Sequence, residues 1–184
     1  MDAQDFLRRP HSELQEQFDR VSDPDGDRIE ALGRLTQLVA AHLSAEQSLV
    51  VPLLKRNGIG DRRLVRRLKS EYRRMGRLAV RIERRKGNSP DMPALVTELQ
   101  DAYRRHVRRF ELYVDPKLRG RVSPDQLEEI EEKMDSAEAT IMSHPHAHLI
   151  SLGPLSRLTT RLAAVVGRQQ GESPPPGGLW RRRN

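Results

Sequence analysis

The sequence contains no cysteine among its 184 residues, and aromatic residues make up only 4% of it. Without cysteine the chain cannot form a disulfide bond, a zinc finger or an iron–sulfur cluster. Any metal must then be bound by nitrogen and oxygen, which suits iron, manganese or zinc. No apolar run approaches the roughly 20 residues of a transmembrane helix, and the N-terminus, with Asp2 and Asp5, lacks a signal-peptide pattern. We therefore expect a cytoplasmic protein.

Charged residues are abundant, at 32% of the chain, and hydrophobic residues account for only 36%. This balance is typical of a helical bundle, which needs narrow apolar stripes and leaves its outer faces charged. Four segments have apolar residues at every third or fourth position: Leu7 to Val21, Ile29 to Leu53, Leu64 to Ile82 and Leu95 to Val114. Strand-like alternation and internal repeats are both absent, so we predict an all-α protein.

Proline, glycine and capping residues set the expected ends of the helices. We predict that Pro52 kinks or ends the second helix and that the fourth helix ends before Pro116. The predicted helices cover about 10–22, 27–56, 62–86, 93–114 and 124–142. The predicted organisation is a four-helix bundle plus a fifth helix (1–148), a C-terminal amphipathic segment (149–170) and a flexible basic tail (171–184).

Each of the four apolar stripes contains a histidine or a tyrosine, and two of them also have a carboxylate about one turn further on. These residues are His11, His42 with Glu46, Tyr72, and His106 with Glu111. Burying an unpaired imidazole or carboxylate costs roughly several kcal/mol, so such groups are expected to share a partner. A metal ion, or two, in the core of a four-helix bundle would be such a partner. The alternative is a purely structural cluster of buried polar groups.

The order of these residues resembles the bacterial hemerythrin-like domain, also called the HHE cation-binding domain, over roughly residues 2–148. Supporting motifs are Val51-Pro52, Val114-Asp115-Pro116-Lys117, Ser123-Pro124-Asp125-Gln126-Leu127 and the His-Pro-His-Ala run at 144–147. The resemblance implies an up-down-up-down four-helix bundle around two non-haem iron ions that share an oxo or hydroxo bridge. It also implies terminal ligands, His11, His42 and His106, and bridging carboxylates, Glu46 and Glu111.

The third helix departs from the family pattern, because Tyr72 stands where a histidine is usual. A phenolate ligand would favour ferric iron and disfavour reversible oxygen binding. Alternatively, Tyr72 is a core residue whose hydroxyl bonds to Glu46 or Glu111. The missing histidine would leave a coordination position for dioxygen, peroxide or nitric oxide. We expect peroxide handling or redox sensing, with catalase-, peroxidase- or oxidase-like activity left open.

The net charge of +7 allows a second kind of function. The basic face of the third helix could bind an acidic protein or nucleic acid in a sensor module with structural metal or none, although a solvated helix surface is the simpler interpretation. A third hypothesis is an oxidative biosynthetic enzyme, which would need a pocket larger than a diatomic ligand requires. We expect His144, His146 and His148 to form a loop against the end of the bundle rather than a second metal site.

Overall fold

The computed structural model describes residues 8–23, 26–85 and 89–142, and within these ranges every regular element is a helix. The predictions for the histidine–proline run, the amphipathic segment at 149–170 and the tail lie outside the described residues. None of the helices in the described part is both long and apolar enough to cross a membrane.

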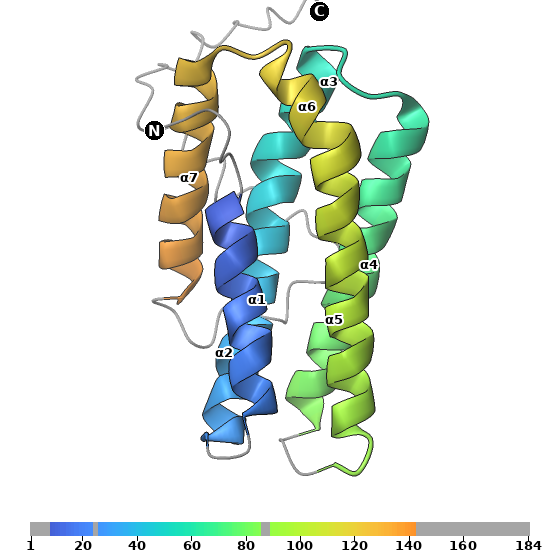
Figure 1. Ribbon diagram of the computed structural model, residues 1–184, viewed down its shortest axis with the longest axis vertical. Coiled ribbons are helices and arrows are strands. Elements are labelled where there is room, and N and C mark those ends of the chain that lie inside the picture. The colour runs from blue at the N-terminus through green and yellow to red at the C-terminus, as the bar shows by residue number, and fades with distance from the viewer. Residues whose placement is uncertain (1–7, 24–25, 86–88, 143–184) are drawn as a thin grey trace, which may run out of the picture.

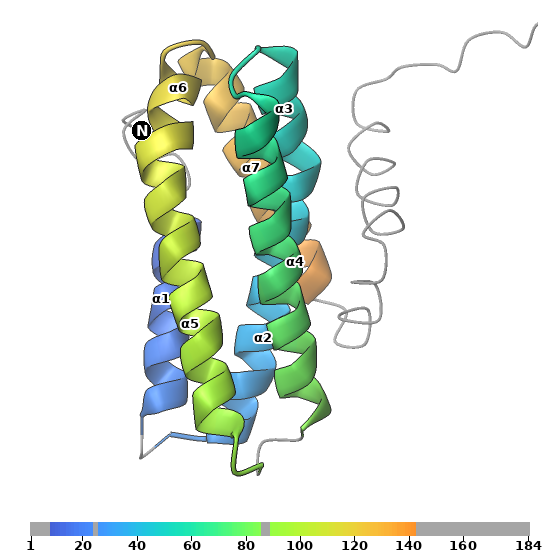
Figure 2. The same ribbon diagram turned by 90° about the vertical axis from the view of Figure 1, so that its right-hand side faces the viewer.

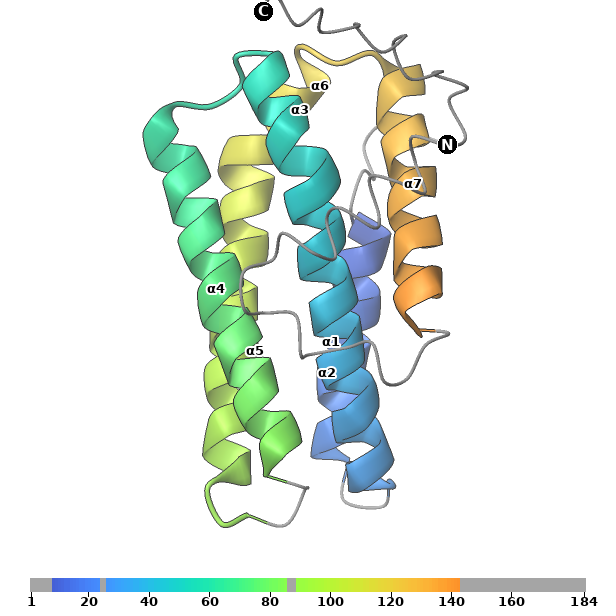
Figure 3. The ribbon, with the colours of Figure 1, turned by 180° about the vertical axis from the view of Figure 1, so that it is seen from behind.

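Four long helices form an antiparallel bundle, which confirms the predicted fold class. They are α1 (Arg8–Ser22), α2 (Arg28–Ala45), α4 (Arg62–Arg84) and α5 (Met92–Arg109). The chain runs down α1, up α2, down α4 and up α5 (Figure 1). Helix α5 lies beside α1, and α4 lies beside α2 (Figure 2). The fifth helix, α7 (Pro124–Met142), packs outside the bundle against α2 (Figure 3).

Side-chain caps explain where two of the helices begin. The Asp27 carboxylate accepts hydrogen bonds from the amides of Ile29 and Glu30, both at 3.0 Å, at the start of α2. Asp61 accepts one at 2.6 Å from the amide of Leu64 at the start of α4. Both carboxylates satisfy amides that have no partner within the helix. The predicted helix starts at 27 and 62 therefore agree with the structure.

The second and fourth predicted helices each contain a π-helical interruption. Helix α2 continues through η1 (Glu46–Val50) into α3 (Val51–Arg56), and α5 continues through η2 (Phe110–Val114) into α6 (Asp115–Arg119). The amides of Val51 and Asp115 bond to carbonyls five residues back, at Glu46 and Phe110. In each case the residue directly after that amide is a proline, Pro52 or Pro116. Such wide turns are rare and often lie at functional sites.

The prediction that the fourth helix ends before Pro116 was wrong, because the chain remains helical to Arg119. Proline is tolerated in the first turn of a helix, where its missing amide hydrogen would have no partner. Pro116 lies in the first turn of α6. An ion pair within α6 supports this turn, with Arg119 Nε donating to Asp115 Oδ1 at 2.9 Å.

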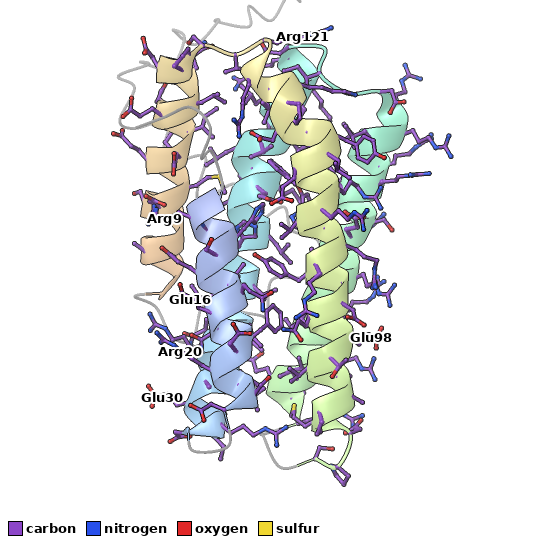
Figure 4. The ribbon with its side chains drawn as sticks, in the orientation of Figure 1. Arg9, Glu16, Arg20, Glu30, Glu98 and Arg121 are labelled. Carbon is purple, nitrogen blue, oxygen red and sulfur yellow. The ribbon has the colours of Figure 1, made fainter. Side chains whose placement is uncertain are left out.

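The outer surface carries ion pairs that connect neighbouring helices. On the exposed face, Arg74 of α4 donates to Glu98 of α5 at 3.0 Å. Figure 4 labels Glu98 on the outer side of α5. Arg9 of α1 pairs with Asp135 of α7. Exposed pairs of this kind contribute little to stability, so the bundle rests mainly on its buried apolar side chains. Buried polar side chains interrupt this core, and several of them meet at one place.

Candidate metal centre

Four buried polar side chains converge inside the bundle. His11 comes from α1, His42 from α2 and His106 from α5, and Glu46 begins η1. One ligand atom from each residue lies within 4.8 Å of those of the other three. Three helices therefore bring together four of the six site residues that the sequence predicted.

Glu46 occupies the centre of this cluster. Its Oε1 lies 3.4 Å from Nε2 of His11 and 3.3 Å from Nε2 of His42, and its Oε2 lies 3.1 Å from Nε2 of His106. The i, i+4 spacing places His42 and Glu46 on one helix face, as expected. All three imidazoles thus turn the same ring nitrogen toward one carboxylate, which brings together four atoms that could hold a metal ion.

Burial and mutual charge set the protonation of the cluster. Burial lowers the pKa of His11 to about 4, so this imidazole is neutral at pH 7. Burial opposes ionisation of Glu46, but His106 and His42 hold its pKa well below the ordinary value. For His106, the charge of Glu46 outweighs burial and raises the pKa. The site therefore contains a fixed negative charge that attracts either a proton or a metal cation.

Glu71 of α4 is a site residue that the sequence analysis missed. Its Oε2 lies 3.6 Å from Nδ1 of His106, and its Oε1 accepts a 2.6 Å hydrogen bond from Nε of Arg109. A carboxylate at this place favours hydrogen on Nδ1 of His106, which leaves Nε2 as the lone-pair donor toward the cluster. In the sequence, the only indication of this role was that Glu71 is adjacent to Tyr72. The contact with His106 depends on how α4 packs against α5, which the sequence pattern does not give.

Tyr72 of α4 is buried, with its ring 5.6 Å from the ring of His106. Burial raises the pKa of Tyr72 well above its ordinary value, and the negative charge of Glu46 adds to this effect. The hydroxyl therefore stays protonated beside the cluster, without a hydrogen bond of good geometry to any described residue. The ring of Tyr72 therefore packs beside the cluster, and its role as a metal ligand stays a prediction.

Glu111 is the predicted site residue that the structure does not bring into the cluster. Its side chain is exposed on η2. Four residues after His106, the position that Glu46 holds relative to His42, the inward-facing residue is Phe110. Its ring lies 6.2 Å from His106 and 5.6 Å from His11. Five helical residues turn Glu111 about 140° away from His106. Its bridging role stays a prediction without structural support.

A surface pocket of about 590 Å³ reaches the cluster at His11. It lies between α1 and the α5–η2 helix, and Val107, Leu112 and Glu111 form part of its lining. Tyr103, which also lines it, donates a 2.6 Å hydrogen bond to the carbonyl of His11 and so holds α1 in place at this point. The pocket gives a small molecule a route to the edge of the cluster.

The sequence model of the hemerythrin HHE cation-binding domain matches residues 2–118, well over half of the chain. The chain belongs to this family. No curated protein and no solved structure matches it. The described part of this HHE domain supplies a buried His/Glu cluster able to bind a metal, in agreement with the prediction of a metal-binding protein.

The residues of this HHE domain fit one cation well. Three imidazole nitrogens and one carboxylate give the four ligands that a transition metal commonly takes from a protein, without sulfur. Glu46 supplies the negative charge, and its Oε2 lacks a hydrogen-bond donor of good geometry in the described structure. A bound cation would satisfy this buried oxygen.

The HHE domain should lose stability in acid when it is metal-free. Because burial lowers the pKa of His11 from 6.5 to about 4, the unfolded chain binds a proton there before the folded chain does. The contribution of His11 is therefore lost as the pH falls from 6.5 to 4, on the order of 3 kcal/mol. His106, whose pKa is raised, contributes in the opposite sense, and its contribution is lost as the pH rises.

Urea unfolding of the metal-free protein between pH 7 and 4.5 measures this effect. A His11→Gln variant is the control, because its unfolding free energy should fall less over the same interval. Parallel pH profiles for the two proteins would contradict the assignment of this loss to His11.

Proposed function

We propose that this HHE domain binds iron at His11, His42, Glu46 and His106 and reacts there with a small oxidant: dioxygen, peroxide or nitric oxide. The observation that carries this proposal is the convergence of three Nε2 atoms on one buried carboxylate, at the end of a pocket open to the surface. If Tyr72 binds the metal as a phenolate, it would stabilise ferric iron, which would favour peroxide handling or redox sensing over oxygen carriage.

Each side chain at the site would have its own role. The three histidines and Glu46 would hold the cation, and the Glu71 carboxylate, 3.6 Å from Nδ1 of His106, would favour the neutral tautomer whose lone pair is on Nε2. Phe110 and Tyr72 pack beside the histidine rings and exclude water from that side. Tyr72, protonated at neutral pH, can donate a hydrogen bond to a bound oxidant. Iron, when bound, would supply the redox chemistry of the reaction with the oxidant.

A more specific version of this proposal is a centre with two iron ions. The four clustered residues provide ligands for one ion, and a second ion needs ligands beyond them. The Tyr72 hydroxyl, on a ring that packs beside His106, is one additional candidate, and Glu111 would have to turn inward past Phe110. Two irons per chain, together with a phenolate-to-iron band, would make Tyr72 a ligand, whereas bound iron without that band would assign it to the wall of the site.

Metal content and the ultraviolet–visible spectrum after anaerobic iron loading test the proposal. We expect bound iron, spectral changes on adding peroxide or nitric oxide, and a visible phenolate-to-iron band if Tyr72 is a ligand. A Tyr72→Phe variant should lose that band alone. If the folded protein binds no metal after loading, the proposal fails, and the basic surface of α4 becomes the alternative functional region.

The pocket at His11 gives a prediction about access. Leu112 lines it and its side chain is 56% exposed, so Leu112→Trp should narrow the pocket without disturbing the core. The reaction of the iron-loaded protein with a bulky alkyl hydroperoxide should slow severalfold, and that with nitric oxide should slow less. Stopped-flow absorbance measures both rates. Ile29→Trp, at another exposed apolar position, is the control. Equal rates in all three proteins would place the entry route elsewhere.

The size of this pocket favours a second candidate function, the oxidation of an organic substrate. A volume of about 590 Å³ exceeds what a diatomic ligand occupies and falls in the range of small-molecule sites. Arg104 and Arg108 line it, so a substrate with a negative charge would fit best. Small organic acids that bind in this pocket should slow amide hydrogen exchange of the residues that line it. The same acids should protect these amides less in the L112W variant, and that difference would support this candidate.

A further inference from the structure

A second pocket, of about 390 Å³, lies at the end of the bundle where α4 begins and α5 ends. Arg63 and Arg67 of α4 form one wall. Arg109 of α5, Tyr113 of η2 and Lys117 of α6 form the other. The two walls are far apart in the sequence, but the helices that carry them, α4 and α5 with its continuation into α6, run side by side at the right of the bundle in Figure 1. This pocket does not include any of the four clustered residues of the candidate metal centre.

The charges around this pocket do not balance. Four cationic side chains line it, and Asp61 is the acidic residue among the lining. The Asp61 carboxylate is already committed to the amide of Leu64 as the cap of α4. Arg63, Arg67 and Lys117 form no ion pair with another described residue. Like charges brought together from three elements repel one another, so an anion between them would lower the free energy.

Two features make the pocket more selective than a general basic surface. Arg109 is fixed, because its Nε donates to Glu71 at 2.6 Å, and a fixed guanidinium loses less entropy on binding an anion. Tyr113 is 52% exposed and lies at the same pocket, although a large aromatic ring is usually covered. An exposed ring beside arginines can stack against a flat, aromatic part of a ligand.

We propose that this pocket binds a small polyphosphate anion, either as a nucleotide or as a free polyphosphate chain. The phosphate oxygens contact Arg63, Arg67 and Lys117, and Arg109 contacts the anion from the α5 side of the pocket. The convergence of cations from α4, α5 and α6 carries this proposal. It does not depend on metal binding, and it differs from nucleic-acid binding along the exposed face of α4, where Arg66 and Arg77 lie outside the pocket.

Isothermal titration calorimetry of the full chain at low ionic strength, with sodium tripolyphosphate and then with ATP, tests the proposal. Each of Arg63→Ala, Arg67→Ala and Lys117→Ala should weaken tripolyphosphate binding about tenfold, as expected for loss of one charge-assisted contact. Arg66→Ala is the matched control: it removes the same charge from the same helix, next to Arg67 but outside the pocket, and should change the affinity little. Thermal unfolding by circular dichroism establishes that each variant is folded.

Tyr113→Ala separates the two sources of polyphosphate. If it weakens ATP binding and leaves tripolyphosphate unchanged, the site recognises a nucleotide. If it changes neither, the site recognises the phosphate chain alone. The proposal is overturned if tripolyphosphate does not bind at millimolar concentration, or if R66A and R67A weaken binding equally. It is also overturned if a short DNA duplex binds more tightly than ATP and R66A or R77A weakens that binding as much as R67A, because the basic face would then act as a whole.

Discussion

Replacing Glu46 with glutamine should reduce the affinity of the domain for iron at least about a hundredfold, the largest effect expected of any single substitution. The carboxylate is the negative charge that all three histidines face, at 3.1 to 3.4 Å. Loss of a supporting residue outside the ligands typically costs 10- to 100-fold in metal affinity, so loss of the central charged ligand should cost no less. Competition with a coloured chelator measures the change.

Glutamine keeps the size of the side chain and one acceptor oxygen, so the E46Q protein should remain folded. Glu131→Gln is the matched control, because Glu131 is also a buried glutamate but lies on α7 outside the cluster. It should bind iron like the original protein. Iron binding unchanged in E46Q would place the metal site elsewhere in the chain and would remove the basis of the proposed function.

Replacing Glu71 with glutamine should give the second-largest effect, a loss of metal affinity of about 10- to 100-fold. Glu71 does not belong to the group of four, but its charge favours hydrogen on Nδ1 of His106 and so presents Nε2 to the cluster. Without this charge the other tautomer becomes competitive, and a hydrogen would then occupy the nitrogen that must bind the cation. The same chelator competition measures the loss.

Glu98→Gln is the control for this second prediction. Glu98 also joins α5 to α4 through an arginine, Arg74, at 3.0 Å, but on the exposed face of the bundle. Both variants lose one carboxylate from the same helix pair, so a difference between them reports the position of Glu71 beside His106 rather than general loosening of α4 against α5. Equal metal affinity in E71Q and E98Q would assign Glu71 a structural role only.

The sequence pattern was sufficient for the bundle because its information is local. Apolar residues at helical spacing predict each helix, and Asp27 and Asp61 show where two of them begin, since a capping carboxylate acts within one turn. Local rules were less successful at Pro116, which was read as a stop although the first turn of a helix accepts proline. The π-helical segments were not predicted either. Their backbone hydrogen bonds span five residues where those of an α-helix span four, and this difference leaves the apolar pattern almost unchanged.

The sequence by itself determined that His11, His42, Glu46 and His106 meet. Each lies within an apolar stripe, and stripes on four helices face one core. Only the tertiary structure decided the remaining residues. Phe110 takes the inward position after His106 and leaves Glu111 outside, and Glu71 reaches His106 across the α4–α5 interface. These outcomes depend on how each helix is rotated against its neighbour, which is fixed by side-chain packing across helices rather than by the spacing of residues along one of them.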